Sequence, residues 1–392
     1  MVLGTLLLNQ KQLAAGVDAF HKAMASDPDQ PAIQKALGWS LMAGSNFEMA
    51  VPVWQDFEKA HPEDSDGPTN LGNCLLRLKR YSEATAAYET AVKIHGDRPQ
   101  EVAQLASTYL LAGERDKADS AYRKLAGVDP TDHDYLNNAA YEMTNADLDL
   151  PLALDYAKKA SHAVEEESES ITLKDLKKED LTKIFRISAD WDTLGWVYEH
   201  MSNMDLAERY LRASWTLTQD GEVAGHLCHL YRRTHQNAAA IKMCRMAIFR
   251  MSMSNQLGAN GYATELRAAQ ENLEHLSPGS TKSSLPTDGS DLSIRERKFN
   301  LPRFLPGTES AEFFVLLAAD GKSKNFVVQD VKFISGSDKM RFQGKQLQGI
   351  NFNFPAPADA HTRFVRRGIL GCYQYTGCSF VLLDPGTVNS LN

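Results

Sequence analysis

A leucine followed by a glycine recurs at a fixed interval along the first part of the chain. The pairs are Leu3-Gly4, Leu37-Gly38 and Leu71-Gly72, each 34 residues after the one before. Two further series keep the same interval: small residues at Gly16, Ala50, Ala84 and Ala118, and aromatic residues at Phe20, Trp54, Tyr88 and Tyr122. A period between about 20 and 50 residues is typical of repeat proteins, in which each repeat packs on its neighbours. The chain is therefore expected to begin with a stacked array.

The recurring residue types have a physical reason if each repeat is a pair of antiparallel helices. Small residues such as Gly38 and Ala50 let two helix backbones approach, because larger side chains would hold them apart. An aromatic residue such as Trp54 is then expected to fill the gap to the next repeat. Because these three series of residues keep the same spacing and phase over four repeats, each repeat is predicted to be a pair of antiparallel helices.

This pattern resembles the tetratricopeptide repeat (TPR) over roughly residues 1–254. The resemblance implies a mainly α fold: a right-handed helical solenoid of about seven units with a capping helix near Tyr262–His275, within residues 1–276. A charged insert at about residues 165–187 is expected to enlarge the fifth unit. Because the repeat containing Gly4 would begin before Met1, we expect the first repeat to be truncated and the chain to be a fragment of a longer protein. A genuine start with a frayed first helix is the alternative.

The periodicity changes after residues 277–300, which are rich in Ser, Pro and Gly and are expected to form a linker. Residues Glu312–Leu317 and Phe326–Ile334 have the apolar patterns of strands, with Asp320-Gly321 as a turn signal between them. A helix is expected within Ser337–Ile350. Residues 301–392 are therefore predicted to be a small α+β domain.

The order of these segments resembles the C-terminal domain of TonB-like proteins. The matching stretches begin at Val331 (Val-Lys-Phe-Ile-Ser-Gly-Ser) and Asn351 (Asn-Phe-Asn-Phe-Pro-Ala-Pro). The arrangement as a whole is similar to the C-terminal half of bacterial proteins that carry a transglutaminase-like domain ahead of TPR units. These resemblances imply a location in the cell envelope or periplasm, with the cytoplasm as the alternative because the chain shows no targeting signal.

The charge of the chain argues against nucleic acid as its partner. The formal net charge is −8, and residues 292–392 carry 13 Lys and Arg against 8 Asp and Glu without a dense basic cluster. No stretch reaches the roughly 20 apolar residues that a membrane span needs. A protein or peptide partner is therefore expected, with no nucleic acid and no transmembrane segment.

The sequence contains no phosphate-binding glycine loop, zinc-protease motif or nucleophile elbow, so neither an enzyme activity nor a cofactor is expected. The most metal-like cluster is His226-Leu-Cys-His229, with Cys244 on a neighbouring helix. However, Cys228 and Cys244 fall on the small-residue and aromatic registers, which predicts buried packing residues. No metal site is predicted.

Cys372 and Cys378 flank an expected hairpin tip and are close enough for a disulfide. Two free thiols in a cytoplasmic protein are the alternative. The envelope location implied by the TonB-like resemblance favours the bridge.

The concave groove of a TPR array is lined by positions of the first helix of each unit that packing does not use. By register, the predicted groove residues are Lys35, Trp39, Asn70, Asn73, Gln104, Ser107, Asn137, Asn138, Tyr141, Asp192 and Trp196. Amide and aromatic side chains suit an extended peptide, whose backbone needs hydrogen-bond partners. The sequence thus predicts a non-catalytic interaction scaffold. The alternative is an accessory region of a larger envelope transglutaminase-like enzyme.

Overall fold

The computed structural model describes residues 1–28, 30–127, 133–253, 260–279, 294–302, 308–319, 325–357, 362–373 and 377–385. The chain divides into two compact units, Met1–Asp129 and Pro130–Asn392. The division lies inside the predicted array, whereas the predicted linker at 277–300 lies within the second unit and falls mostly outside the described residues. The second half of the array and the strand-rich region therefore share one unit.

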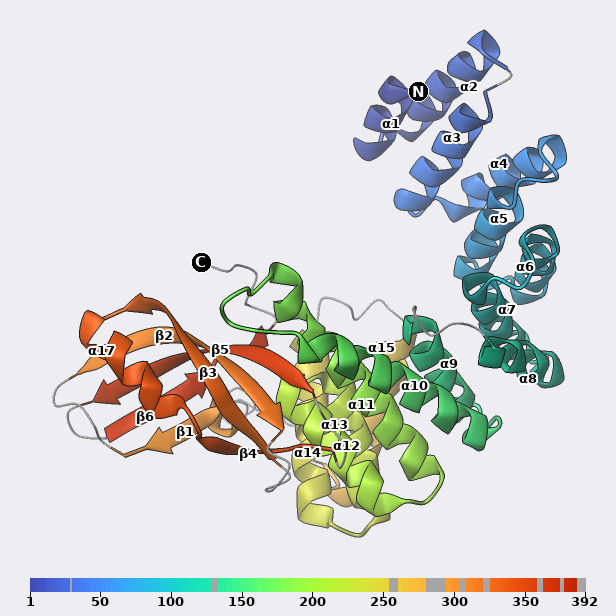
Figure 1. The fold of residues 1–392 in the computed structure, drawn as a ribbon. Coiled ribbons are helices and arrows are strands. Elements are labelled where there is room, and N and C mark those ends of the chain that lie inside the picture. Colours follow the sequence, from blue (N-terminus) through green and yellow to red (C-terminus); the bar gives the residue numbers. More distant parts are fainter. Residues whose placement is uncertain are drawn as a thin grey trace. The chain divides into compact units, whose positions relative to one another are not determined.

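The described helices of the array form antiparallel pairs of the TPR type (Figure 1). In the first unit they are α1 (Val2–Asn9), α2 (Leu13–Ser26), α3 (Pro31–Ala43), α4 (Phe47–Ala60), α5 (Asp66–Arg77), α6 (Tyr81–His95), α7 (Pro99–Leu111) and α8 (Arg115–Lys124), followed by the short η1 (Leu125–Gly127). In the second unit they are α9 (His133–Asn145), α10 (Leu150–Glu169), α11 (Lys178–His200), α12 (Met204–Thr218), α13 (Gly221–Arg233) and α14 (Asn237–Met253), followed by α15 (Asn260–Leu276). We call the odd-numbered helix of each pair helix A and the even-numbered one helix B. The predicted fold class, a helical solenoid followed by a small strand-rich region, is confirmed.

The glycine and aromatic registers meet inside each pair. A Cβ atom built on Gly38 would lie 2.5 Å from the ring of Trp54, and one on Gly72 would lie 2.8 Å from Tyr88. Both rings are almost fully buried. Each of these two rings therefore covers the glycine of its own helix pair, and the expectation that Trp54 also fills the gap to the next repeat stays a prediction.

The turn between helix A and helix B repeats as faithfully as the helices. Lys11, Ser45, Lys79 and Gly113 follow one another by 34 residues, and each has a positive φ between 59° and 81°. In the second pair the N–H of Asn46 donates to the carbonyl of Leu41 at 2.8 Å. This bond closes the end of a helix whose last carbonyls would otherwise lack donors. The turn geometry therefore shares the period of the packing.

The charged insert lengthens both helices that flank it. Helix α10 runs to Glu169 and α11 begins at Lys178, so the connection between them projects beyond the array and lies over the sheet (Figure 1). Three apolar residues of the insert are buried against β2 and β5. The resulting cluster contains Ile171, Leu173, Leu181, Phe314, Leu316 and Val365. The insert is thus a packing surface for the strand-rich region.

The strand-rich region is a six-stranded antiparallel sheet in the order β1-β6-β5-β2-β3-β4. The strands are β1 (Lys298–Leu301), β2 (Glu309–Ala319), β3 (Asn325–Gly336), β4 (Asn351–Pro355), β5 (Arg363–Tyr373) and β6 (Gly377–Leu382). Phe299 of the edge strand β1 stacks on Phe352 of the other edge strand, β4, with 4.2 Å between the ring centroids. The sheet must therefore curl so that its two edges meet.

The strands and the helix of the tail agree only in part with the predicted segments. Both predicted strands lie within β2 and β3, whereas β1 was missed and begins inside the predicted linker. The predicted helix is shorter, consisting of α17 (Asp338–Gln343) and η3 (Gly344–Leu347). The turn at Asp320-Gly321 lies outside the described residues.

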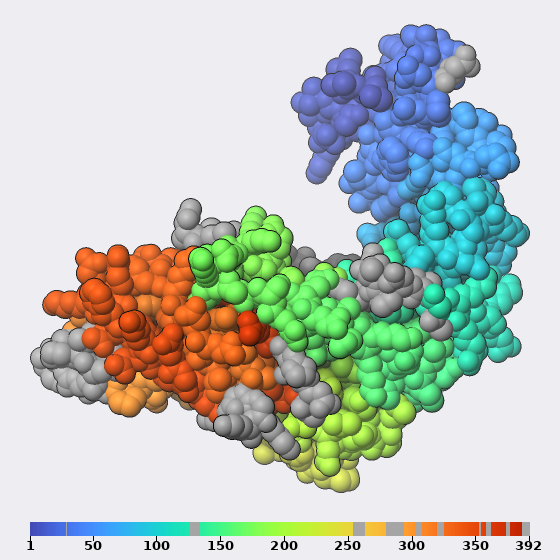
Figure 2. All heavy atoms as spheres, viewed as in Figure 1, coloured from blue at the N-terminus to red at the C-terminus, as the bar shows by residue number. Residues whose placement is uncertain are grey.

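The sheet packs on the second half of the array, and the two form one continuous surface in Figure 2 (orange against green). Trp191 of α11 stacks on Phe326 of β3 at 5.9 Å between ring centroids. Arg366 of β5 is 2% exposed and donates to the carbonyls of Leu217, at 2.6 Å, and Leu383, at 2.9 Å. Leu217 is in the last turn of α12, where a positive charge is favoured.

Within the described residues, no helix is long and apolar enough to cross a membrane.

Candidate functional site

The predicted groove residues of the first unit are mostly engaged with their own chain. Lys35 Nζ lies 2.7 Å from Asp64 Oδ2 and 2.5 Å from Asp66 Oδ2. Burial alone would lower the pKa of Lys35, but these two carboxylates outweigh it and raise the pKa. The Lys35 side chain therefore stays charged, and its ion pairs with Asp64 and Asp66 link two successive helix pairs.

The two predicted asparagines of α5 are used in the same way. Asn70 donates to the backbone carbonyl of Asp66 at 2.8 Å, and Asn73 accepts a hydrogen bond from Tyr88 at 2.7 Å. Gln104 and Ser107 lie half-buried on α7. Trp39 differs from these residues because it is 46% exposed, with its ring 5.9 Å from that of Trp54.

The predicted groove residues of the second unit lie closer together. Tyr141 of α9 donates to Glu222 Oε1 of α13 at 2.5 Å. Trp196 of α11 donates from Nε1 to Asn145 Oδ1 at 2.8 Å. Asn138 is exposed on α9. Three successive A helices are thus connected by side chains on one face.

His226 of α13 lies at the centre of these contacts. Its Nδ1 is 2.9 Å from Asp192 Oδ1, and its ring stacks on Trp196 with the centroids 4.1 Å apart. Burial alone would lower the pKa of His226, but the Asp192 carboxylate, helped by Glu222 and Glu265, raises the pKa to about 9. The imidazole is therefore held as a buried cation at neutral pH.

A cavity of about 530 Å³ opens beside this cluster, and we call it the helix-A cavity. Its lining residues are Asn137, Asn138, Tyr141, Phe185, Ser188, Ala189, Asp192, Thr193, Thr218, Asp220, Glu222, Val223, Arg250 and Asp384. Most of them belong to α9, α11 and α13. Four predicted groove residues, Asn137, Asn138, Tyr141 and Asp192, are therefore brought together around one cavity, and Trp196 contacts the His226 ring next to it.

Sequence reasoning missed the other charged residues of this cavity. Asp220 and Glu222 come from the start of α13, whose first turn the repeat register leaves unassigned. Arg250 comes from helix B, and Asp384 follows β6. The Asp220-Gly221-Glu222 sequence is a helix N-cap signal that could have found the first two. No short-range signal links Asp384 to the array, because that contact depends on how the sheet packs.

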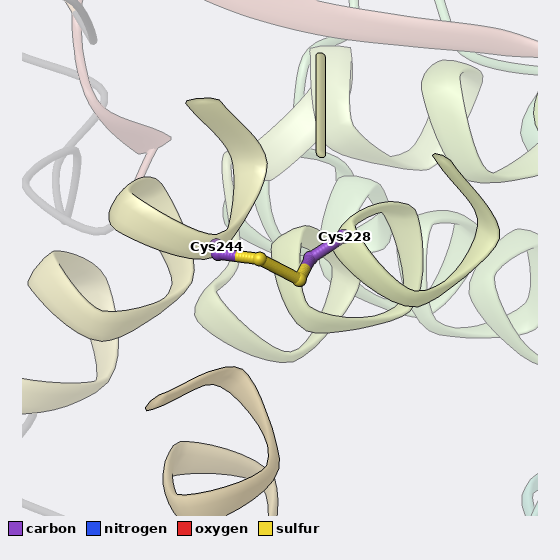
Figure 3. Close-up of a disulfide and its surroundings, with 2 residues drawn as sticks. All are labelled: Cys228 and Cys244. Carbon is purple, nitrogen blue, oxygen red and sulfur yellow. A yellow bond between two sulfur atoms is a disulfide. The ribbon is translucent and has the colours of Figure 1, made fainter. Parts of the chain in front are cut away.

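The cysteines of the metal-like cluster are bonded to each other. Cys228 of α13 and Cys244 of α14 form a buried disulfide that joins helix A to helix B (Figure 3). The prediction that both side chains are buried is confirmed, whereas their bond was not foreseen. His229 pairs with the buried Glu199 at 3.1 Å. In the described part of the chain, no group of three or more His, Cys, Asp or Glu side chains is arranged to hold a metal ion.

A second disulfide joins Cys372 of β5 and Cys378 of β6, the two cysteines for which a bridge was predicted. These residues face each other in the strand register, with their Cα atoms 4.0 Å apart. The remaining cysteine, Cys74, is buried and free.

Comparisons with known proteins agree with the repeat architecture. Two family models of the tetratricopeptide repeat match residues 35–99 and 103–132. No curated protein sequence matches the chain. The chain therefore contains TPR units, and the TonB-like and transglutaminase-like resemblances remain predictions.

Several solved structures are similar in fold. One is MamA, with 20% identity, coverage of 43% of this chain and 98% of that one, and a TM-score of 0.37. Another is YrrB, described as a TPR protein with an unusual peptide-binding site, with 13% identity, coverage of 52% and 95%, and a TM-score of 0.39. A third is the Cut9–Hcn1 assembly, with 15% identity, coverage of 64% and 45%, and a TM-score of 0.44. These similarities concern the fold alone.

Proposed function

We propose that this chain is a non-catalytic interaction scaffold that binds an extended peptide segment of a partner protein along α9, α11 and α13. The observation that supports the proposal is the helix-A cavity, where side chains from three successive A helices converge. Its volume of about 530 Å³ falls in the range of roughly 300–1,000 Å³ that is usual for ligand pockets. Polar groups such as Asn138 and Thr193 line it, and they can bond to a peptide backbone.

Filling the cavity tests this proposal. Ala189 is exposed and lines the cavity, so Ala189→Trp places a large ring there without removing a contact from the core. Peptides selected on the full wild-type chain from a random display library should bind the Ala189→Trp variant at least about tenfold more weakly.

Ala238→Trp is the matched control, because Ala238 is also exposed but lies on α14 and does not line the cavity. This variant should bind the selected peptides like the wild type. Equal binding by all three proteins, or selection of no peptide at all, would show that the cavity is not the binding site.

We also propose that the protein works in an oxidising compartment such as the cell envelope. Two disulfides support this location, because such bonds persist outside the reducing cytoplasm. Intact mass after alkylation under native and denaturing conditions, with and without reductant, tests it on protein purified from its own compartment. Labelling of four further cysteines after reduction fits the proposal, and the same labelling before reduction contradicts it.

A further inference from the structure

The charges that line the helix-A cavity do not balance. Arg250 donates to Asp384 Oδ2 from Nη1 at 3.1 Å and from Nη2 at 3.2 Å. Arg297, which does not line the cavity, also pairs with this oxygen at 3.7 Å, so Asp384 is fully paired. Three lining carboxylates remain: Asp192, Asp220 and Glu222. Within the described residues, none of the three forms an ion pair with a lysine or an arginine, and the His226 ring is the cation that pairs with Asp192. The wall therefore carries an excess of negative charge.

The same wall has more hydrogen-bond acceptors than donors. Both oxygens of Asp192 lie around the single Nδ1 of His226, at 2.9 and 3.1 Å. Glu222 Oε1 accepts from Tyr141, and Asp220 Oδ1 accepts from the backbone N–H of Glu222 at 2.8 Å. Each carboxylate can accept about four hydrogen bonds, so most of this capacity is unused.

Asn137 provides an independent observation. This residue lines the same cavity, and its Oδ1 is buried and has no hydrogen-bond partner among the described residues. A buried carbonyl oxygen without a donor is destabilising, and a ligand that brings a donor to it would relieve that cost. The cavity thus has fewer donors and less positive charge than its four lining carboxylates and the Asn137 oxygen could pair with.

The pKa shifts of two carboxyl groups in the wall also favour a cationic ligand. Burial raises the pKa of Asp220 and of Glu222, and the charge of Asp192 raises both further. The charge of His226 lowers both, and Arg250 lowers the pKa of Asp220, but the net shift of each carboxyl is upward. A cation placed between these carboxylates would remove the repulsion and favour their ionised forms.

We infer that the helix-A cavity binds the side chain of a lysine or arginine in the partner's peptide segment. This inference rests on the proposed function and adds the chemistry that the groove selects. An ammonium or guanidinium group supplies several N–H donors and a positive charge, which would pair with the carboxylates Asp192, Asp220 and Glu222 of the wall. The cavity also exceeds what a bare metal ion needs, and its polar and apolar walls can hold the aliphatic stem of such a side chain.

The test measures charge dependence on the full chain. Asp220→Asn keeps an N-cap side chain for α13, and Glu222→Gln keeps an acceptor for Tyr141, so the double variant removes two charges with little change in shape. Peptides selected on the wild type from a random display library should be enriched in lysine or arginine. Their dissociation constants should rise at least about tenfold with the double variant.

The matched control is Asp155→Asn with Glu166→Gln, which removes the same charge from exposed positions on α10. This control should bind the selected peptides like the wild type. Peptides without basic enrichment, or equal binding by the cavity variant and the control, would overturn the inference. The Ala189→Trp variant separates this inference from the proposed function. If Ala189→Trp loses binding while the charge variant does not, the cavity binds peptides but does not select a basic side chain.

Discussion

The A helices present polar side chains in both compact units, but the two sets are used differently. In Met1–Asp129, Lys35 is neutralised by Asp64 and Asp66, and Asn73 holds the hydroxyl of Tyr88. In Pro130–Asn392, the corresponding side chains surround a cavity lined by four carboxylates and one arginine, where Asn137 Oδ1 has no hydrogen-bond partner among the described residues. One repeat pattern therefore supports internal cohesion at the groove positions of the first unit, whose cavity of about 540 Å³ is lined by none of the predicted groove residues. In the second unit the groove positions themselves surround a ligand-sized cavity.

This difference teaches that groove position alone does not identify a binding residue. A side chain on a helix A face contributes to binding only if its hydrogen-bonding capacity is left free by its own chain. In the first unit that capacity is largely consumed, and Trp39 is the predicted groove residue left most exposed. Substitutions in the first unit should change stability, and those around the helix-A cavity should change binding.

The largest stability effect is expected at the aromatic register of the first unit. Trp54 is fully buried over Gly38, so Trp54→Ala should lower the free energy of unfolding by about 3–5 kcal/mol. Trp39→Ala, on the neighbouring ring that is 46% exposed, should cost much less. Urea unfolding followed by circular dichroism measures both. Equal losses would mean that the two rings are equally part of the core, which would contradict the distinction between packing and groove positions.

The next effect concerns the buried cation of the second unit. The pKa of His226 is about 9 in the folded chain, against about 6.5 when unfolded, so protonation stabilises the fold fully below pH 6.5. That stabilisation, on the order of 3 kcal/mol, should be lost as the pH rises through 9. Asp192, Glu222 and Glu265 face the ring and set the shift.

Replacing Asp192 tests this assignment, because Asp192→Asn removes the carboxylate that contributes most to raising the pKa of His226. The variant should show a flatter decline of unfolding free energy between about pH 6 and pH 10 than the wild type. Asp155→Asn, on the exposed surface of α10, should keep the wild-type slope. A wild-type slope in the Asp192→Asn variant would mean that another group titrates.

The cavity of the second unit also depends on how the sheet packs on the helices. Arg366→Met would leave the carbonyls of Leu217 and Leu383 without their buried donor and should cost roughly 1–3 kcal/mol of unfolding free energy. Because Asp384 lies one residue beyond Leu383, binding of basic peptides should weaken as well. Arg363→Met is the control on the same strand, where the side chain forms no hydrogen bond in the described part of the chain. Thermal melts and peptide titration of the two variants should therefore differ, and matching results would remove the role assigned to Arg366.

The repeat array was predictable because its signal is periodic. Spacings of 34 residues identify the helix pairs. Gly38 and Trp54, which touch within one pair, are 16 positions apart in the sequence. Cys228 and Cys244 are also 16 residues apart, at the same two positions of the last pair. The register predicted that both would be buried, and the shared spacing could have predicted their bond.

The chemistry of the cavity was predictable only in part. Tyr141 and Asp192 follow from the register because they are on A helices. The negative balance of the wall depends on Arg250 meeting Asp384, which is 134 residues away in the sequence. Such a contact arises from the packing of the sheet on the helices, which no local pattern records. The same holds for β1, a four-residue edge strand whose only sequence context is the linker.

The smallest effect is expected at the one lysine among the predicted groove residues. Lys35→Met keeps the aliphatic stem but loses the ion pairs with Asp64 and Asp66, which should cost about 0.5–1 kcal/mol because the pair is partly open to solvent. The loss should shrink at high salt, which screens such pairs. Binding of basic peptides should be unchanged, whereas the Asp220→Asn, Glu222→Gln variant should keep its stability and lose binding. If Lys35→Met alters peptide affinity instead, the first unit takes part in recognition, and the separation of cohesion from binding between the two units is wrong.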